Sequence, residues 1–466
     1  MNARHRKRRL LLAATVLLLL AGGGIALIAI RHHRPGDVFH RSAPFHAEQT
    51  PRVARGRHVA PWPMYGFTKN HDRYYPASPK LRPPYRRIWR FSGNALLEFP
   101  PVIDNSTVYQ LNDSGVMHAL ATDSGRVRWQ RRLGTLAASS PAASGSSVYA
   151  TLLQHGAGDR GRVISVRQLD GHVRWIRDLP SRSESSPLLD RGRLYLGSES
   201  GVVYGLDAHH GRVLWTYHAG GAVKASPTLR EGKLYFGDYG GHVQAIREDN
   251  GKRVWLAGSG KGLISGGNFY STAAASYGRV FLGNTDGRVY AFDARTGRLA
   301  WAKQTGAYVY SSPAVNDTKG LGPTVYVGSY DGRFYALSAY SGAVRWEYDA
   351  HGKISGSPTI VGSIVYFAVL GSHYTVGLDT RTGRQVYARH NGSFDPVITD
   401  GSRIFLTGNT GLFALIPTGR RRVPAPRRPA SSPQRASSTH RAVARRASIC
   451  PTMFVVSLTS PGSGAC

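Results

Sequence analysis

The chain has 466 residues with 55 glycines, 10% aromatic residues and a formal net charge of +33, more than half of it in residues 1–61 and 419–466. This length suits one large all-β domain with appendages, because abundant glycine and aromatic residues favour short strands with tight turns over helical bundles. The only cysteines, Cys450 and Cys466, lie near the C-terminus, which excludes a disulfide framework, a cysteine metal site and a cysteine nucleophile in the body of the chain and leaves their mutual pairing open.

The N-terminus predicts a membrane anchor. Residues 1–9 are basic, and the uncharged run 10–30 is long enough to cross about 30 Å of hydrocarbon as a helix. A cleavable signal peptide has a shorter apolar core and a small-residue exit, so we favour an uncleaved anchor over cleavage. The preceding basic residues place the N-terminus in the cytoplasm and residues 31–466 outside, which removes nucleic acid as a partner. Residues 31–61 lack periodicity and are predicted to be a linker.

Residues 62–418 contain a repeat. Tryptophans recur at intervals of 40 to 46 residues, Tyr387 takes the next place in the series, and a glycine lies four residues before each position from the second tryptophan onward. The tryptophans are Trp89, Trp129, Trp175, Trp215, Trp255, Trp301 and Trp346. A period of about 40 residues built from short strands predicts a β-propeller, because one such sheet cannot bury both of its faces alone.

Each repeat predicts one four-stranded blade. In residues 185–215, three glycine-containing turns separate four strands, and glycine supplies the positive φ that hairpin turns need. Seven repeats are complete, whereas an eighth begins at Asp395 and ends near Pro417 without a final strand or tryptophan. Residues 85–91 have the pattern of a final strand with no blade before them. We therefore expect this segment to complete the eighth blade and close the ring, which protects the sheet edges.

The C-terminal segment, residues 419–466, is predicted to be a disordered basic tail. It is rich in proline, serine and arginine, has no acidic residue and shows no apolar period. Its charge serves solubility, or attracts a wall polymer or membrane surface with a strength that falls as salt rises.

Residues 291–301 fit the pattern A-x-D-x-x-T-G-x-x-x-W, which resembles the pyrroloquinoline quinone (PQQ)-like repeat family over residues 62 to about 417. The aspartate is kept only at Asp207, Asp293 and Asp379, so a uniform chemical role for it is not expected. The resemblance implies an all-β, eight-bladed propeller. It also implies that the repeated tryptophans dock between neighbouring blades and do not bind the quinone.

The resemblance leaves two classes of function open. Quinone-dependent dehydrogenases of this family stack PQQ beneath adjacent cysteines and hold Ca²⁺ near a catalytic aspartate, but this chain has no adjacent cysteines. It also lacks the HExxH, GxSxG and GxxxxGK[ST] motifs. The chain is similar to the non-catalytic propeller lipoprotein of the outer-membrane β-barrel assembly machine, without its lipid-bearing cysteine. We expect a monomeric, membrane-anchored scaffold without cofactor that binds an envelope protein or an anionic wall polymer. The alternative is a PQQ- and calcium-dependent sugar or alcohol dehydrogenase.

Binding is expected at the funnel mouth of the propeller, where loops lead from each outer strand to the next inner strand. The candidate side chains in these loops are Arg182, Lys224, Lys261, Phe269, Tyr308, Tyr310 and Lys353. Three lysines with few carboxylates suit an anionic ligand such as an acidic glycan or peptide loop. The alternative is that these side chains only pack or solvate the rim. No metal site is expected.

Overall fold

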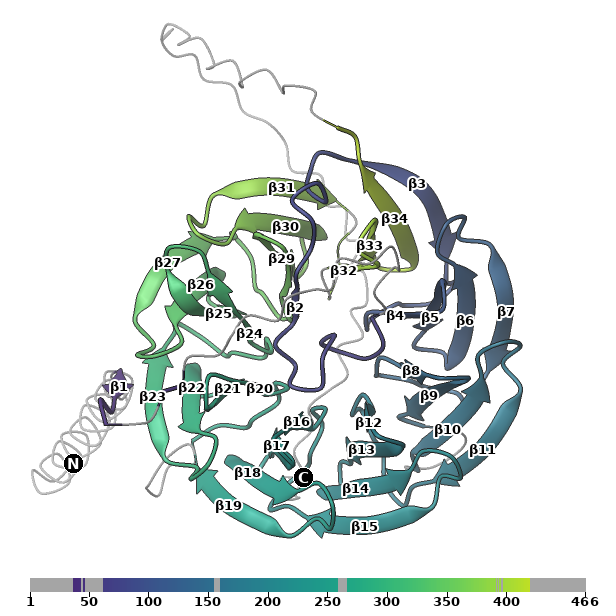
Figure 1. The fold of residues 1–466 in the computed structure, drawn as a ribbon, viewed down its shortest axis with the longest axis horizontal. Helices are drawn as coiled ribbons and strands as arrows, with labels where there is room; N and C mark the ends of the chain where they lie inside the picture. Colours follow the sequence, from purple (N-terminus) through teal and green to yellow (C-terminus); the bar gives the residue numbers. More distant parts are fainter. Residues whose placement is uncertain are drawn as a thin grey trace, which may run out of the picture. The chain divides into compact units, whose positions relative to one another are not determined.

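The computed structural model describes residues 37–42, 45–46, 62–154, 160–258, 266–390, 392, 394 and 397–419. Every regular element within these residues is a β-strand, and the strands form eight sheets arranged as the blades of a ring (Figure 1). The predicted all-β, eight-bladed propeller is therefore confirmed. No helix in the described part of the chain is long and apolar enough to cross a membrane. The predicted anchor 10–30 and the tail beyond Gly419, with both cysteines, lie outside the described residues.

Seven blades are consecutive stretches of four antiparallel strands, ordered from the innermost strand to the outermost. Blades 1 to 3 are β4 (Val102–Asp104), β5 (Thr107–Leu111), β6 (Val116–Ala121) and β7 (Val127–Arg132); β8 (Ala142–Ser144), β9 (Ser147–Leu152), β10 (Arg162–Arg167) and β11 (Val173–Asp178); and β12 (Leu188–Asp190), β13 (Arg193–Gly197), β14 (Val202–Asp207) and β15 (Val213–His218). Blades 4 and 5 are β16 (Thr228–Arg230), β17 (Lys233–Gly237), β18 (His242–Arg247) and β19 (Arg253–Gly258); and β20 (Ala274–Ser276), β21 (Arg279–Gly283), β22 (Arg288–Asp293) and β23 (Leu299–Gln304). Blades 6 and 7 are β24 (Ala314–Thr318), β25 (Gly322–Gly328), β26 (Arg333–Ser338) and β27 (Val344–Asp349); and β28 (Thr359–Val361), β29 (Ile364–Val369), β30 (Tyr374–Asp379) and β31 (Gln385–His390).

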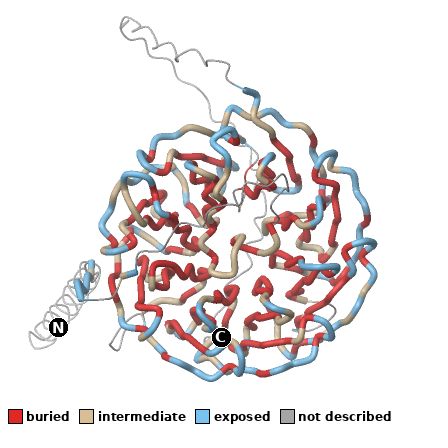
Figure 2. Tube along the Cα trace, in the orientation of Figure 1, coloured by how far each residue is buried: buried red, intermediate tan, exposed pale blue. Residues whose placement is uncertain are grey.

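Blade 3 shows how the repeat encodes a blade. Arg191 and Gly192, with φ of 44° and 74°, form the tight turn between β12 and β13, as a hairpin with two positive φ angles requires. Almost every residue of β13 is buried, because the middle strands pack against neighbouring blades on both faces. The outermost strand β15 is largely exposed except at Trp215. Figure 2 shows the same gradient from buried inner strands to exposed outer strands around the ring.

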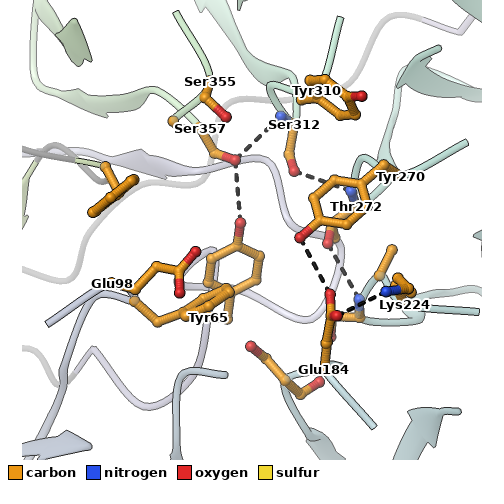
Figure 3. A pocket seen from close by; sticks show the side chains of 16 residues that line it. Tyr65, Glu98, Glu184, Lys224, Tyr270, Thr272, Tyr310, Ser312, Ser355 and Ser357 are labelled. Carbon is orange, nitrogen blue, oxygen red and sulfur yellow. Dashed lines mark hydrogen bonds and ion pairs between the residues drawn. The ribbon is translucent and has the colours of Figure 1, made fainter. Parts of the chain in front are cut away.

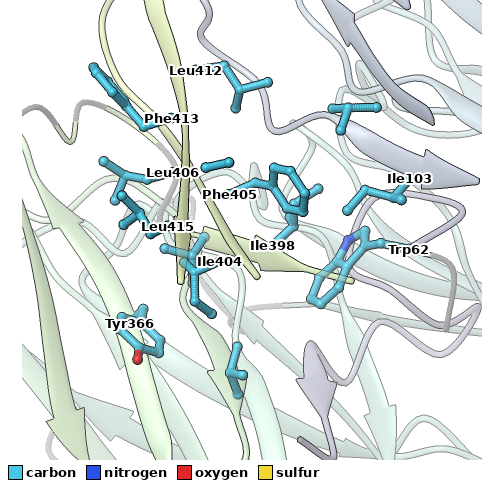
Figure 4. Packing of buried hydrophobic residues seen from close by; sticks show 14 of the residues in the cluster. Trp62, Ile103, Tyr366, Ile398, Ile404, Phe405, Leu406, Leu412, Phe413 and Leu415 are labelled. Carbon is cyan, nitrogen blue, oxygen red and sulfur yellow. The ribbon is translucent and has the colours of Figure 1, made fainter. Parts of the chain in front are cut away.

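Blade 8 is completed by a strand from the N-terminal side of blade 1. Its sheet order is β3-β34-β33-β32, with β3 (Tyr85–Ser92), β34 (Gly411–Pro417), β33 (Ile404–Thr407) and β32 (Val397–Thr399). Trp89 of β3 lies opposite Ala414 of β34 in antiparallel register. The buried side chains of Trp62, Phe405 and Leu412 belong to one core cluster at this seam (Figure 4). The predicted closure of the ring by residues 85–91 is therefore confirmed.

Residues 62–75, which we call the axial segment, cross the ring along its innermost strands (Figure 1). Trp62 bridges Ile103 of blade 1, and β2 (Tyr74–Tyr75) pairs in parallel with β28 of blade 7. Backbone amides of four further blades donate to carbonyls of this segment. These are Ala143 to Pro63, Leu229 to Lys69, Ala275 to Asn70 and Val315 to Asp72, at 2.7 to 2.9 Å. One short stretch thus joins blades 1, 2, 4, 5, 6 and 7.

A short strand before the propeller adds a fifth strand to blade 5. In β1 (Val38–Phe39), Val38 pairs with Ala302 of the outermost strand β23. Lys303 forms a 2.7 Å ion pair with Asp37, and the ring of Phe45 stacks on Tyr277 at 5.8 Å. Nothing in the composition of residues 31–61 predicts this strand, because two residues are too few to show a periodicity.

Candidate functional site

The repeated tryptophans lie between neighbouring blades. The indole Nε1 of Trp301 donates to Ala339 O at 3.0 Å, and a Cβ added to Gly342 would lie 2.7 Å from Cε3 of the same ring. The other six donate to the carbonyl oxygen of the following blade: Trp89 to Thr122, Trp129 to Gln168, Trp175 to Ala208, Trp215 to Glu248, Trp255 to Ala294 and Trp346 to Thr380. Each ring is therefore engaged by backbone at its edge and on one face.

A belt of hydroxyl groups surrounds the axis of the ring. In several blades a serine or threonine stands two residues before the inner strand, and its hydroxyl accepts a hydrogen bond from the backbone amide of the equivalent residue in the preceding blade. The bonds run from Ser140 N to Ser186 Oγ, from Ser226 N to Thr272 Oγ1, from Thr272 N to Ser312 Oγ and from Ser312 N to Ser357 Oγ, at 2.9 to 3.2 Å. These hydroxyls hold adjacent inner strands in register.

An axial cavity of about 90 Å³ lies within this belt (Figure 3). Six of its lining residues come from one repeated position, three residues before the proline that precedes the inner strand of a blade. That position supplies Glu98, Glu184, Lys224, Tyr310 and Ser355, and Tyr270 where alanine replaces the proline. Tyr65 of the axial segment, Phe99 and Phe394 complete the aromatic lining, and Tyr65 shares a 3.1 Å hydrogen bond with Ser357 Oγ.

Lys224 is the basic residue of this lining, and it is already neutralised. Its Nζ lies 2.8 Å from Oε1 of Glu184 and 2.8 Å from Oε1 of Glu199. Burial disfavours the ammonium ion, but the two carboxylates outweigh this effect and raise the pKa of Lys224 above its ordinary value. The hydroxyl of Tyr270 donates to the other oxygen of Glu184 at 3.3 Å. Lys224 therefore has little capacity left to attract an anion.

Glu98 is a second carboxyl group at the cavity. Burial raises the pKa of Glu98 to about 7, and the nearby negative charges of Glu184 and Asp113 are smaller contributions in the same direction. Among the described residues, no hydrogen bond or ion pair engages its carboxyl group, which Figure 3 draws beside Tyr65 without a dashed contact. The cavity is thus acidic and aromatic rather than basic.

A chain of five tyrosines leads from the cavity to the surface. Ring centroids of neighbours lie 6.3 Å apart for Tyr239 and Tyr270, 5.5 Å for Tyr270 and Tyr310, and 5.0 Å for Tyr310 and Tyr330. Tyr308 packs against both Tyr310 and Tyr330, and its side chain is 52% exposed. Tyrosine combines a large apolar ring with a hydroxyl group, which is the chemistry that protein interfaces favour.

The structure separates the seven side chains expected at the mouth. Lys224 and Tyr310 line the cavity, and Tyr308 is exposed. Lys353 is also exposed, with Nζ 5.6 Å from the ring centroid of Tyr330. Arg182 is half-buried, whereas Lys261 lies outside the described residues. Phe269 is 0% exposed and packs against Tyr290 at 5.5 Å, so its ring belongs to the core of blade 5 and not to the mouth.

The axial cavity itself has two carboxyl groups and one lysine in its lining, whereas a surplus of lysine was expected at the mouth as a whole. Sequence reasoning missed Glu98, Glu184, Tyr65 and Tyr270, although the first two occupy the same repeat position as Lys224. Aligning the repeats on the proline before each inner strand and comparing the residue three places earlier would have identified them. Tyr65 had no such signal, because it lies outside the repeats.

The cavity does not fit PQQ or a calcium ion. PQQ is a planar tricarboxylate, and the lining offers two carboxyl groups and one lysine that is already paired. Ligand pockets for molecules of drug size typically measure about 300–1,000 Å³, whereas this cavity measures about 90 Å³. Within the described ranges, no group of three or more His, Cys, Asp or Glu side chains is placed to hold a metal ion.

A family model described as outer membrane protein assembly factor BamB matches residues 85–190, 159–320 and 319–423. Among solved structures, BamB from Moraxella catarrhalis is similar with a TM-score of 0.60 and 16% identity, over 71% of this chain and 99% of that one. A europium-containing methanol dehydrogenase has a TM-score of 0.64 and 14% identity, over 77% and 98%. A quinohemoprotein alcohol dehydrogenase from Pseudomonas putida has a TM-score of 0.66 and 14% identity, over 83% and 85%. No curated protein sequence matches the chain. At these identities the structural likenesses establish the fold alone.

Proposed function

Because this chain belongs to the family described as outer membrane protein assembly factor BamB, we propose that it is a non-catalytic scaffold of the cell envelope that binds another envelope protein at its funnel mouth. The predicted anchor at residues 10–30 supports a propeller held at the membrane with residues 31–466 outside the cytoplasm. Membership of the family supports the cell envelope as the location and a protein as the class of partner. We assign the binding surface to the mouth.

The observation that carries this proposal is the tyrosine chain that runs from the axial cavity to the exposed Tyr308. Five clustered tyrosines give a rigid, amphipathic surface at little cost in conformational entropy, because each ring has two side-chain torsions. An anionic wall polymer is the less favoured partner, because Lys224 is paired with Glu184 and Glu199. Of the lysines expected at the mouth, the exposed Lys353 is the one still available to an anionic polymer. Since we favour a protein partner, we expect Lys353→Ala to leave retention on an anionic-polymer column unchanged.

Site-specific photo-crosslinking tests the proposal. A photoreactive phenylalanine analogue replaces Tyr308 in the full-length protein in its own membranes, and a control protein carries it at Leu169, which is 81% exposed on the turn between β10 and β11. We expect a discrete protein adduct from position 308 and none from position 169. Equal labelling from both positions, or none from position 308, would refute binding at the mouth.

The second candidate, a PQQ-dependent sugar or alcohol dehydrogenase, is supported by the fold shared with the two dehydrogenases. The small, acidic cavity argues against it, because a tricarboxylate would meet Glu98 and Glu184 while the lysine of the lining is already paired. Purified protein mixed with PQQ and Ca²⁺ should give no dye reduction with glucose or ethanol. Turnover with either substrate would overturn the scaffold proposal in favour of the enzyme.

A further inference from the structure

We propose that the axial cavity binds the ammonium group of a lysine side chain presented by a partner protein, with Glu98 as its counter-ion and aromatic rings as its walls. The identity of the ligand as part of a protein rests on the proposed function, whereas the chemistry of the cavity does not. The inference follows from the charge, the lining and the size of the cavity.

The charge of the cavity is unbalanced. Glu184 and Glu199 share Lys224, so Glu98 is left without a cation among the residues that the structure describes. The buried guanidinium group of Arg73 lies 4.2 Å from the ring centroid of Tyr65 and forms no ion pair with Glu98. Glu98 is half-buried, and a partly desolvated carboxylate without a counter-ion is costly, so a ligand that brings a positive charge is favoured at this position.

The walls fit a lysine side chain. Tyr65, Phe99, Tyr270, Tyr310 and Phe394 surround the space next to Glu98. Aromatic faces attract cations through their quadrupole, and the same rings provide apolar contact for a methylene chain. The hydroxyl groups of the belt add acceptors for the three N–H donors of an ammonium ion.

The size of the cavity limits the ligand to one slender chain. A volume of about 90 Å³ is several times the volume of about 10–15 Å³ that one water molecule needs, and it leaves room for one slender chain. The axial segment contributes Tyr65 to the lining and hydrogen-bonds to the inner strands, so the described chain crosses the ring on that side. A ligand therefore approaches from the side of the mouth loops, along the tyrosine chain.

The proposal has a pH signature. The pKa of Glu98 is about 7 in the free protein, with Glu184, Asp113 and Lys224 as the charged groups near it and with Tyr65, Tyr270 and Tyr310 as neutral neighbours. A bound ammonium ion stabilises the ionised carboxylate and lowers this pKa. Binding must then release a proton below pH 7, so the affinity falls as the pH falls through 7 and is constant well above it.

Calorimetric titration with n-butylammonium, which reproduces the end of a lysine side chain, tests the cavity without any partner. The full-length protein in detergent is titrated at pH 6 and at pH 8, with n-butanol as the uncharged control ligand. We expect n-butylammonium to bind about tenfold more tightly at pH 8 than at pH 6, as one linked proton with a pKa near 7 requires. n-Butanol should bind weakly and without dependence on pH.

Two variants complete the test. Glu98→Gln should abolish both n-butylammonium binding and its pH dependence, whereas Asp249→Asn, at an exposed carboxylate of blade 4, should change neither. Equal binding of the two ligands, pH-independent affinity or full binding by Glu98→Gln would overturn the inference. The wild-type comparison decides the matter even if Glu98→Gln does not fold. A crosslinked adduct from position 308 without n-butylammonium binding would refute the ammonium site and leave the proposed scaffold function intact. Binding of n-butylammonium without an adduct would refute the protein partner and leave the ammonium site intact.

Discussion

Replacing a docking glycine tests whether the tryptophans hold the blades together. Gly342 has φ of 74° and precedes β27, and a Cβ placed on it would lie 2.7 Å from Cε3 and 2.9 Å from Cδ2 of Trp301 in blade 5. Real Cβ atoms do not approach carbon so closely, so the indole must move. It would then leave its 3.0 Å hydrogen bond to Ala339 O.

The chain offers a matched control at Gly232, which has φ of 73° and no heavy atom within 4 Å of an added Cβ. Both alanine variants bear the left-handed backbone strain of about 1–2 kcal/mol. Gly342→Ala adds overpacking of about 1–3 kcal/mol and the indole hydrogen bond of about 0.5–1.5 kcal/mol. The free energy of unfolding should therefore fall by about 1.5–4.5 kcal/mol more in Gly342→Ala than in Gly232→Ala, which is the sum of the two added terms.

Urea unfolding followed by circular dichroism measures both variants, with stability taken from the midpoint and the slope. In a Trp301→Leu background, where the clash is removed, Gly342→Ala should cost no more than Gly232→Ala does in the wild type. Equal losses for the two glycine variants in the wild type would refute the docking argument. So would a Gly342→Ala loss that persists unchanged in the Trp301→Leu background.

The closure of the ring, the buried histidine of the axial segment and the added strand of blade 5 can each be tested. A chain that begins at residue 62 should unfold as cooperatively as the full-length chain. A chain that begins at residue 93 lacks β3 and the axial segment, so it should aggregate through the exposed edge of β34, which size-exclusion chromatography would detect. A folded monomer from residue 93 would contradict the closure of the ring by β3. Burial, with a smaller contribution from the positive charge of Arg73, lowers the pKa of His71 well below 6.5. As the pH falls below 6.5, His71 therefore becomes protonated in the unfolded chain but stays neutral in the folded chain. Stability should therefore fall by up to about 1.4 kcal/mol for each pH unit below 6.5, and His71→Asn should remove this part of the slope in urea titrations at pH 7 and pH 5. Phe45→Ala removes the ring that stacks on Tyr277 and lies 5.1 Å from the guanidinium carbon of Arg279. It should speed tryptic cleavage after Arg41, whereas Leu169→Ala should not. Equal cleavage rates would show that the ring of Phe45 does not help β1 to hold residues 37–42.

The architecture was predictable because a blade is a local object. Alternating apolar residues, turn glycines such as Gly192 and one inward tryptophan specify four strands within about 40 residues. The incomplete eighth repeat and the unmatched strand at residues 85–91 then require each other, because each would otherwise expose an edge. The family resemblance followed from the same repeated positions.

The candidate site was much less predictable. Lys224 was expected to face an anion, but Glu184 of the preceding blade and Glu199 neutralise it. Phe269 was placed at the mouth, but it is buried against Tyr290 and Phe292. In both cases the sequence identifies the residue but does not predict which side chains surround it, because those side chains come from other parts of the chain.

The sequence by itself determined the repeat, the number of blades and the strand that closes the ring, because these depend on hydrophobic alternation and turn chemistry between near neighbours in the chain. Only the tertiary structure decided the character of the axis, where one residue from each of several blades meets the others. Glu98 and Tyr310 are more than two hundred residues apart, yet they line the same cavity. Burial and the pairing of charges across the ring then set which group is neutralised and which is left without a counter-ion among the described residues.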